Sequence, residues 1–362
     1  MKTVKVKIIG AGSIGNHLAQ ACRRMDWDVV VVDRDRAALD RMRNDLYPSR
    51  YGRWDARIEL RVSAEEPRGG FDIICIGTPP DARMGLAVRA LEERPKILQL
   101  EKPLCCPTLE GLDLFLSRYG AQRETIAVVG YDHAVSQAVS AVLERLDSGW
   151  AGEIATVDVE FREHWDGIFK AHPWLSGPRD SYLGFWSRGG GAGGEHSHAL
   201  HLWQLFAGRA GLGRWRQVSA VMAMEQAGGA DYDSLCAFSF VTDRGKVGRV
   251  VQDVVTSPPR KCARLQGSEG FIEWICNGHA KGDMVCYGRA GKDPVEEVYP
   301  KTRPDDFYRE MDHLRELLEK RISPEQSPIS LDSGVAVMQV LATAHRHRNG
   351  TAEIPSAPYT SR

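Results

Sequence analysis

The stretch Val4-Lys5-Val6-Lys7-Ile8-Ile9-Gly10-Ala11-Gly12-Ser13-Ile14-Gly15 near the amino terminus decides the fold. Its first six residues are rich in β-branched side chains, which favour a β-strand. Glycines then interrupt the run at Gly10, Gly12 and Gly15, and a helical pattern of apolar residues extends from Ile14 to Met25. The stretch therefore predicts a strand, a tight turn and a helix that packs closely on the strand.

The three glycines match a pattern that is typical of dinucleotide-binding proteins. In that pattern Gly10 permits the tight turn, Gly12 lets the backbone approach a pyrophosphate, and Gly15 lets the helix lie close to the strand. The first turn of the helix, with Ser13 and Ile14, offers N–H groups and a positive dipole end to the phosphates. We therefore expect these five residues to bind a dinucleotide cofactor.

An acidic residue follows at the spacing that this pattern requires. A second apolar strand, Asp28–Val32, ends at Asp33, eighteen residues after Gly15. A carboxylate at this position would accept hydrogen bonds from the adenosine ribose hydroxyls and would repel a 2′-phosphate, which favours NAD. Arg34 and Arg36 leave NADP open as the alternative, because a guanidinium beside the acid can pair with a phosphate.

Composition limits the class of protein only broadly. The chain has 362 residues, enough for two domains, and its net charge of −1 gives no field that would attract nucleic acid or an anionic membrane. We expect neither as a partner. The eight cysteines include no CxxC pair, the first strand starts directly after Met1-Lys2-Thr3, and no apolar run has the length of a membrane span. We therefore expect a reduced, cytoplasmic protein.

The first part of the chain alternates strands and helices. The elements expected after Asp33 are a helix at Arg36–Leu46, a loop at Tyr47–Trp54, a strand at Phe71–Ile76, a helix at Asp81–Glu93, a strand at Ile97–Leu100, a helix at Thr108–Tyr119 and a strand at Thr125–Val129. This order predicts an α/β domain with a doubly wound parallel sheet, the Rossmann fold, over residues 1–127.

The pattern changes in residues 128–362. A helix is expected at Ser136–Leu146, and apolar and polar residues then alternate at Ile154–Phe161, Val218–Met224, Leu235–Val241, Val247–Val255 and Phe271–Trp274. Such alternation predicts an α+β domain with an open, mostly antiparallel sheet, covered on one face. We expect this domain to bind substrate and to form a homodimer or homotetramer through the sheet, with Phe240 and Trp274 contributing.

Three further motifs carry a resemblance to a known family. The strand at Phe71–Ile76 closes at Gly77-Thr78-Pro79-Pro80, the next strand runs into Glu101-Lys102-Pro103, and the glycine-rich run Gly189–Gly194 leads into a histidine-rich helix. On these motifs the chain resembles the Gfo/Idh/MocA oxidoreductases, the family of glucose–fructose oxidoreductase and inositol dehydrogenase, over nearly its whole length. The resemblance implies hydride transfer between a nicotinamide and a hydroxyl-bearing carbon of a sugar, cyclitol or sugar derivative.

The resemblance also implies roles for the residues that follow the two strands. Gly77, Thr78 and Pro79 would lie against the cofactor, and Glu101 would contact the nicotinamide ribose. Lys102 would also contact the cofactor and would act as the acid and base toward the substrate hydroxyl or carbonyl. Such work by a lysine near neutral pH requires burial or a neighbouring positive charge.

The histidine-rich helix supplies the second catalytic element that the resemblance implies. His198 is similar to the family histidine that carries a proton or holds the substrate. Glu195, on the same helix face, resembles the acid that orients it. Many members place this acid four residues before the histidine, where this chain has Gly194. They carry aspartate where this chain has His201, so the role of His201 stays open.

The same helix also permits a metal site in principle. Glu195, His198 and His201 share a helix face and could supply three zinc ligands. Hydride transfer with a lysine needs no metal, and we therefore assign none.

Substrate residues are expected in an aromatic segment and after the last strand of the first domain. Trp174 and Tyr182 could pack on the C–H surface of a sugar, and Arg179 could bind a carboxylate or phosphate. The alternative for this segment is an ordinary packed loop. Tyr131 and His201 complete the candidate set. The stretch Tyr131-Asp132-His133-Ala134 lacks an arginine that many family members have, and Arg83 stands where a histidine is common.

Two other functions remain compatible with these residues. Some relatives keep the cofactor bound and carry out a redox-neutral elimination or epimerisation. A cofactor-binding sensor without catalysis is the third reading, although the retained Lys102 and His198 argue against it.

Overall fold

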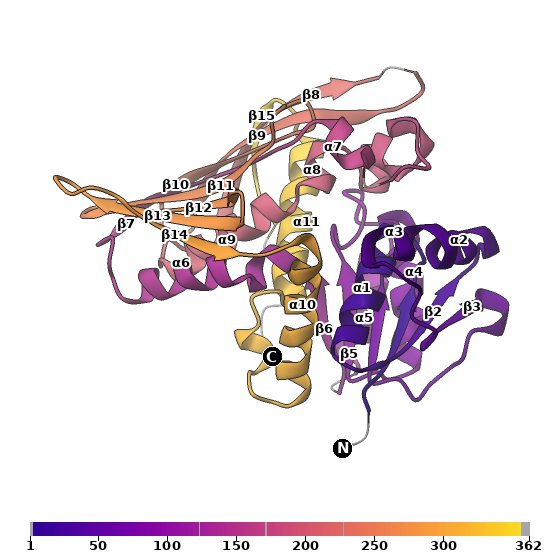
Figure 1. The fold of residues 1–362 in the computed structure, drawn as a ribbon. Coiled ribbons are helices and arrows are strands. Elements are labelled where there is room, and N and C mark those ends of the chain that lie inside the picture. Colours follow the sequence, from indigo (N-terminus) through magenta and orange to yellow (C-terminus); the bar gives the residue numbers. More distant parts are fainter. Residues whose placement is uncertain (1–2, 123, 171, 227, 356–362) are drawn as a thin grey trace. The chain divides into compact units, whose positions relative to one another are not determined.

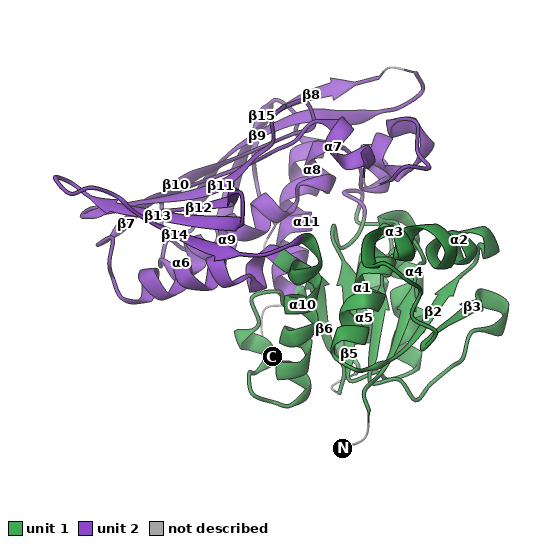
Figure 2. Ribbon diagram, viewed as in Figure 1, with its two compact units in different colours: residues 1–105, 109–132, 303–331 green, residues 106–108, 133–302, 332–362 purple. Residues whose placement is uncertain are grey.

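The computed structural model describes residues 3–122, 124–170, 172–226 and 228–355, and the chain divides into two compact units (Figures 1 and 2). Unit 1 comprises residues 1–105, 109–132 and 303–331. Unit 2 comprises residues 106–108, 133–302 and 332–362.

The described residues of unit 1 form a six-stranded parallel sheet with the strand order β3-β2-β1-β4-β5-β6. The strands are β1 (Lys5–Ile9), β2 (Asp28–Asp33), β3 (Ile58–Val62), β4 (Ile73–Ile76), β5 (Ile97–Glu101) and β6 (Ile126–Gly130). The order reverses between β1 and β4, which is the topological switch point at which doubly wound sheets bind ligands. The sheet confirms the predicted Rossmann fold.

Unit 1 also contains helical elements, most of which connect these strands. They are α1 (Ser13–Arg24), α2 (Arg36–Arg41), the π-helical turn η1 (Met42–Leu46), α3 (Tyr47–Tyr51), η2 (Ser63–Glu65), α4 (Pro80–Glu92), α5 (Leu112–Gly120), α10 (Arg303–Leu318) and η7 (Pro324–Gln326). The strands β1 and β4 are almost completely buried, as expected for a sheet with helices on its faces.

Two expectations for unit 1 were wrong. The segment expected as a loop at 47–54 continues the preceding helix through Tyr51, because Tyr47 and Trp54 pack edge to face with ring centroids 5.2 Å apart and anchor it. The strand β3 had no counterpart in the prediction. It lies at the edge of the sheet and alternates apolar residues with Glu59 and Arg61, a pattern that a solvated segment shares.

The division into units differs from the single boundary expected at residue 127. The strand β6 continues to Gly130, and residues 303–331 belong to unit 1 rather than to the second half of the chain. The physical reason is the packing of α10 on α1, where the rings of His17 and Phe307 stack with centroids 4.5 Å apart.

The described residues of unit 2 form a nine-stranded mixed sheet with the order β14-β13-β12-β11-β7-β10-β9-β8-β15. Its strands are β7 (Ile154–Arg162), β8 (Trp215–Glu225), β9 (Tyr232–Thr242), β10 (Val247–Asp253), β11 (Arg260–Gly267), β12 (Gly270–His279), β13 (Gly282–Arg289), β14 (Val295–Pro300) and β15 (Gly350–Glu353). Only the β7–β10 pair is parallel in the described sheet, which confirms the mostly antiparallel prediction.

Helices of unit 2 cover one face of this sheet (Figure 1). The helical elements are η3 (Asp132–Val135, which starts at the last residue of unit 1's segment 109–132), α6 (Gln137–Asp147), α7 (Trp165–Lys170), η4 (Pro178–Asp180), η5 (Tyr182–Gly184), η6 (Trp186–Arg188), α8 (Gly191–Glu195), α9 (His198–Arg209) and α11 (Leu331–Arg346, which starts at the last residue of unit 1's segment 303–331). Among them α6, α8 and α9 pack directly on the strands.

The role expected for Phe240 and Trp274 was wrong. Both side chains lie in the core, 1% and 0% exposed, with Phe240 against Trp203 and Trp274 against Phe161. They therefore pack between sheet and helices and are not available to a second copy of the chain.

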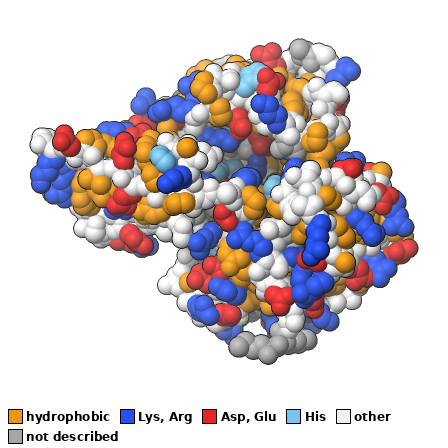
Figure 3. All heavy atoms as spheres, in the orientation of Figure 1, with side chains coloured by type: hydrophobic (Ala, Val, Ile, Leu, Met, Phe, Trp, Pro, Cys, Tyr) orange, Lys and Arg blue, Asp and Glu red, His pale blue; other side chains and the backbone are white. Residues whose placement is uncertain are grey.

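Three further properties are plain from the structure. Over the described ranges, no helix combines the length and the apolar character needed to cross a membrane. On the face drawn in Figure 3, basic and acidic side chains are interspersed over both units, in keeping with the net charge of −1. All eight cysteines are thiols.

Candidate active site

The glycine turn between β1 and α1 is shaped by close backbone contacts in unit 1. Gly10 has a φ of 112°, and a Cβ there would lie 3.1 Å from the carbonyl carbon of Gly77. A Cβ on Gly15 would collide with the carbonyl oxygen of Gly10. By contrast, a Cβ on Gly12 would meet nothing within 4 Å. Packing thus requires glycine at two of the three positions, and Gly12 opens onto unfilled space.

Asp33 lies at the end of β2 and contacts the same turn. Its Oδ2 accepts a hydrogen bond of 2.7 Å from the N–H of Ala11, and its Oδ1 accepts one of 2.9 Å from the N–H of Asp35. These bonds fix the carboxylate beside the turn, where each oxygen keeps a second lone pair for another donor. Arg34 and Arg36 are both exposed next to it.

Ser13 and Ile14 begin α1, and Arg50 of α3 reaches this helix start. Its Nη2 donates to Ser13 Oγ at 3.0 Å, and its Nη1 donates to the Ser13 carbonyl oxygen at 3.2 Å. The first N–H groups of a helix have no partner within the helix and attract anions. A guanidinium at this position adds positive charge to that end, a feature that the sequence pattern did not reveal.

The turn after β4 contributes Gly77, Thr78 and Pro79. Gly77 packs against the glycine turn, so that a Cβ on it would lie 3.5 Å from the N of Gly15. Thr78 Oγ1 is buried and has no hydrogen-bond partner among the residues that the structure describes. Buried hydroxyls are normally satisfied, so this atom is suited to a bound ligand.

These features fit a dinucleotide. The unfilled space at Gly12 suits the close approach of a pyrophosphate, the start of α1 suits its charge, and the Asp33 carboxylate suits ribose hydroxyls. Gly10, Gly12, Ser13, Ile14, Gly15 and Asp33 lie at this one turn of unit 1.

Glu101 is the last residue of β5 and Lys102 follows it, and a buried arginine holds this turn. The guanidinium of Arg83, 2% exposed, donates to the carbonyl oxygens of Glu101, Pro103 and Thr78. The peptide bond between Lys102 and Pro103 is cis. Lys102 is half-buried, and its N–H donates to Glu101 Oε2 at 3.3 Å. Sequence reasoning noted Arg83 only as a departure from a family pattern.

The carboxylate of Glu101 lies in a buried polar group. Gln99 Nε2 donates to Glu101 Oε1 and to Glu310 Oε1, each at 2.9 Å. Burial raises the pKa of Glu101 above its usual range, although the positive charge of Arg83 acts to lower it. Burial and the negative charge of Glu101 together raise the pKa of Glu310. Gln99 and Glu310 were not singled out from the sequence, because Glu310 is more than 200 residues from its partner.

In unit 2 the predicted single helix of Glu195 and His198 is divided. The helix α8 ends at Glu195, and α9 begins at His198, with His196 and Ser197 as a link between them. The expectation that Glu195 and His198 share one helix face was therefore wrong. The link is fixed by Gln252, whose buried Nε2 donates to the carbonyl oxygen of His196.

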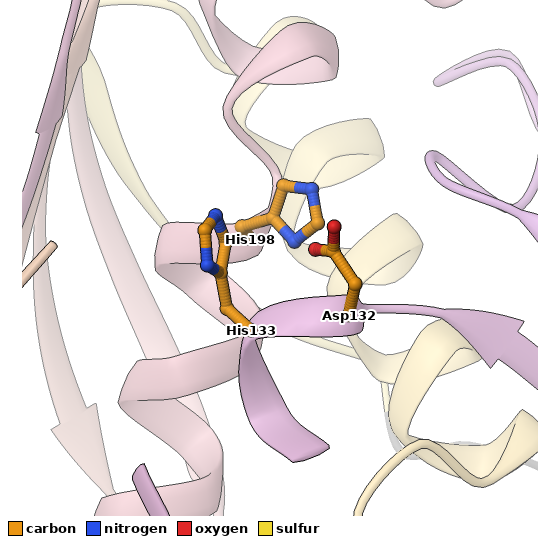
Figure 4. Close-up of side chains that lie close together, drawn as sticks. All are labelled: Asp132, His133 and His198. Atoms are coloured by element: carbon orange, nitrogen blue, oxygen red, sulfur yellow. The ribbon is translucent and has the colours of Figure 1, made fainter. Parts of the chain in front are cut away.

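His198 lies beside His133, a residue that the sequence did not mark as functional. Their ring centroids are 4.9 Å apart at an interplanar angle of 74°, and Figure 4 shows the two imidazoles side by side. Phe161 stacks on His198, with ring centroids 6.2 Å apart. Figure 4 also draws Asp132, which precedes His133 on the turn η3. One potential ligand atom from each of these three residues lies within 4.8 Å of the others.

This group differs from the zinc set considered from the sequence. Among the described residues, Glu195, His198 and His201 do not bring their donor atoms together in such a group. His201 is 1% exposed, and its Nε2 lies 3.2 Å from Ser333 Oγ at the start of α11.

The candidate substrate residues are distributed over both units. Tyr131 is fully buried directly after β6 in unit 1. In unit 2, Trp174 is half-buried against His172, Tyr182 is half-buried in η5, and the exposed Arg179 donates to the carbonyl oxygen of Gly228 at 3.4 Å. The backbone of Tyr182 lies against Gly190 of the glycine-rich run.

Comparison with known proteins gives one family match and many structural ones. Residues 6–98, within unit 1, match the TrkA-N domain family. A search of curated proteins by sequence gives no match.

Solved structures align over almost the whole chain. Levoglucosan dehydrogenase in complex with NADH and L-sorbose aligns with a TM-score of 0.76 and 17% identity, over 99% of this chain and 100% of that chain. An oxidoreductase from Agrobacterium radiobacter in complex with NAD⁺, L-tartaric acid and magnesium aligns with a TM-score of 0.75 and 16% identity, over 98% and 99%. GenD2 from gentamicin A biosynthesis in complex with NAD aligns with a TM-score of 0.71 and 18% identity, over 98% and 97%. Over almost its full length, this chain has the fold that these solved structures share.

Proposed function

We propose that this protein is an NAD(P)-dependent oxidoreductase. It transfers a hydride between the nicotinamide and a hydroxyl-bearing carbon of a sugar, cyclitol or sugar derivative. The observation that carries the proposal is the contrast within the glycine turn. Gly10 and Gly15 are required by backbone contacts, whereas a Cβ on Gly12 would meet nothing within 4 Å among the residues that the structure describes. Packing within the protein does not require glycine at position 12. The glycine there therefore supports a bound ligand that the backbone approaches too closely for a side chain to fit between them.

NAD is the cofactor that the site favours. The Asp33 carboxylate is fixed beside the turn by two backbone N–H groups and presents negative charge where a 2′-phosphate would lie. Levoglucosan dehydrogenase and GenD2 were crystallised with NADH and NAD, which supports the same class of cofactor. The exposed Arg34 and Arg36 keep NADP as the alternative.

The chain's own residues supply binding and proton transfer. When bound, the cofactor supplies a hydride donor or acceptor at the nicotinamide. Lys102 takes the proton from the substrate hydroxyl during oxidation and returns it during reduction. Arg83 fixes the backbone from which Lys102 extends. His198 and Glu195 assist by holding the substrate and by carrying a proton.

The proposed substrate class rests on the structurally similar proteins and on the candidate substrate residues of this chain. Levoglucosan dehydrogenase was crystallised with L-sorbose, which supports a carbohydrate-like substrate. In our proposal Trp174 and Tyr182 pack on the sugar, Arg179 and His201 contact its polar groups, and Tyr131 lines the same site.

We also propose a homodimer or homotetramer formed by the uncovered face of the sheet of unit 2. Val221, Val247 and Val298 on this sheet are 62%, 56% and 37% exposed. Exposed aliphatic side chains on one sheet support an interface between copies. Analytical ultracentrifugation tests this part of the proposal separately.

The test is a titration of the purified, nucleotide-free protein with NADH and, separately, with NADPH, followed by energy transfer from tryptophan. Saturable binding is expected, with NADH the tighter ligand. Gly12→Ala should weaken binding at least about tenfold, because its methyl group enters the space of the pyrophosphate. Gly85→Ala is the matched control, since a Cβ there also meets nothing within 4 Å but lies on α4.

Two results would overturn the proposal. Folded protein that binds neither dinucleotide would show that the glycine turn is structural. Equal binding by the Gly12→Ala and Gly85→Ala variants would show that the dinucleotide binds elsewhere.

A further inference from the structure

We propose that Asp233 is the residue that positions the glycine-rich run Gly189–Gly194 and, through it, the start of α9 at His198. The inference rests on the proposed function only for the role of His198. The packing that carries it lies entirely within unit 2. Asp233 therefore acts through the backbone and is a positioning residue.

Asp233 lies on β9 with its carboxylate fully enclosed. The residue is 0% exposed, and its Oδ2 accepts the N–H of Gly193 at 2.5 Å. The thiol of Cys236 donates to the same oxygen at 3.0 Å. A buried carboxylate that accepts a backbone N–H makes a strong, charge-assisted hydrogen bond. This bond ties α8 to the sheet at one defined point.

The glycine-rich run is shaped to fit this carboxylate. Gly191 has a φ of 76°, and a Cβ there would collide with Asp233 Oδ1. A Cβ on Gly193 would lie 3.2 Å from Asp233 Oδ2. Side chains at either position would push the backbone away from Asp233. The two glycines are thus explained by the carboxylate on β9, rather than by flexibility.

The hydrogen bond that fixes Gly193 also restrains His198, because the two residues are close in the chain and the link between them is itself held. The helix α8 ends two residues after Gly193, and His198 begins α9 three residues later. Between them the carbonyl oxygen of His196 accepts from the buried Gln252. A shift of α8 on β9 therefore displaces the imidazole of His198, and small displacements of catalytic groups lower rates strongly.

Three titratable or charged groups face Asp233 from the packed elements. His345 of α11 has its Nε2 3.6 Å from Asp233 Oδ1, Cys236 lies on β9, and Arg348 follows α11. Burial raises the pKa of Asp233 to about 6, and burial lowers that of His345 to about 3. Burial also raises the pKa of the Cys236 thiol. Between pH 5 and 7, therefore, Asp233 changes its charge while His345 and Cys236 stay neutral.

The charge of Asp233 matters because it strengthens the bond to Gly193. As the pH falls through about 6, the carboxylate becomes a neutral acid and its hydrogen bond from Gly193 weakens. The position of α8, and with it that of His198, then depends on pH without any change in the cofactor-binding residues of unit 1.

The experiment follows backbone amide signals by NMR in the full-length protein between pH 5 and 8. The Gly193 amide is expected to shift with a midpoint of about pH 6, and the Ala199 amide beside His198 is expected to show a component with the same midpoint. Both effects should disappear in Asp233→Asn, which keeps the shape but not the charge. Asp158→Asn is the control, because Asp158 pairs with the exposed Arg249 on the same sheet.

The outcomes separate this inference from the proposed function. A Gly193 signal that is constant between pH 5 and 8 in the unaltered protein overturns the inference even if Asp233→Asn does not fold. A Gly193 signal that titrates without a matching component at Ala199 overturns the link to His198. NADH affinity, measured in parallel, should change less than about twofold in Asp233→Asn, and failure of the unaltered protein to bind NADH contradicts only the proposed function.

Discussion

The guanidinium of Arg83 donates a hydrogen bond of 2.5 Å to the carbonyl oxygen of Glu101. The same group donates to the carbonyl oxygens of Pro103 and Thr78. One buried cation on α4 thus joins the turn after β4 to the turn after β5. Because Lys102 extends from the second of these turns, Arg83 is part of the frame that holds the proposed acid and base.

Arg83→Met is expected to lower the free energy of unfolding by about 3 kcal/mol or more, since it leaves buried carbonyl oxygens without a donor. Arg83→Lys should recover only part of this loss, because an ammonium does not reproduce the planar fork of a guanidinium. Chemical denaturation measures both effects. Arg89→Met, on an exposed position of the same helix, is the control and should stay within about 0.5 kcal/mol of the unaltered protein.

Lys102→Met is expected to abolish hydride transfer while leaving the affinity for NADH almost unchanged. Methionine has a similar length but cannot exchange a proton. The measurements are NADH binding by energy transfer and turnover with a substrate found by a screen of sugars and cyclitols. Lys96→Met, at an exposed lysine before β5, should keep full turnover. Turnover retained in Lys102→Met would remove the acid–base role from this lysine.

The sequence predicted the parts of the site that depend on neighbours along the chain. The glycine turn, Asp33 and the doubly wound parallel sheet of unit 1 follow from local pattern and spacing. The contacts made by Arg83 and Asp233 could not be predicted from the local sequence, because their partners lie on other strands and turns that only the folded chain brings near. An arginine or aspartate in a helix or strand is ordinarily a surface residue, and nothing in its local sequence indicates burial.

The local sequence also failed to reveal several strands in the second half of the chain. The strands β11, β13, β14 and β15 were not predicted, since charged residues in Arg260–Gly267 and Val295–Pro300 mask their alternation. Phe240 and Trp274 were expected at an interface because large aromatic residues are common both in cores and at interfaces. Only the packing of helices on the sheet decides between these two environments.

The stability of the protein should fall as the pH decreases from about 6.5 to 4, in part through His313. This side chain on α10 is 8% exposed, lies 2.8 Å from Ser327 Oγ, and has a pKa that burial lowers to about 4. The unfolded chain binds a proton near pH 6.5 and the folded protein does so only near pH 4, so stability is lost as the pH falls through this window. The loss from this group amounts to about 3 kcal/mol.

His313→Gln tests this pH dependence. The free energy of unfolding, measured at several pH values between 6.5 and 4, should depend less on pH in the variant than in the unaltered protein. His279→Gln, at an exposed position on β12, should show the unaltered dependence. Identical pH profiles for His313→Gln and the unaltered protein would show that this histidine is accessible to protons in the folded state.

Glu310→Gln is expected to stabilise the protein at alkaline pH. Burial and the charge of Glu101 raise the pKa of Glu310 well above its usual range. Stability from such a group is fully present below the pKa of the unfolded chain and is lost as the pH rises. Glutamine carries no charge to bury, and its amide can donate to Gln99 Oε1, which has no partner among the described residues. The gain in the free energy of unfolding between pH 6 and 8.5 should be about 1 to 3 kcal/mol.

The half-buried Glu316 on the last turn of α10 provides the control, since Glu316→Gln changes the same helix without altering the buried group. A Glu310→Gln variant that loses stability at pH 8.5 would mean that the ionised carboxylate is satisfied in the folded protein. The buried group of Gln99, Glu101 and Glu310 would then be a stabilising network of charges. A gain in stability would instead mean that the chain retains a costly buried acid beside Glu101, as expected where a side chain serves the turn that carries Lys102.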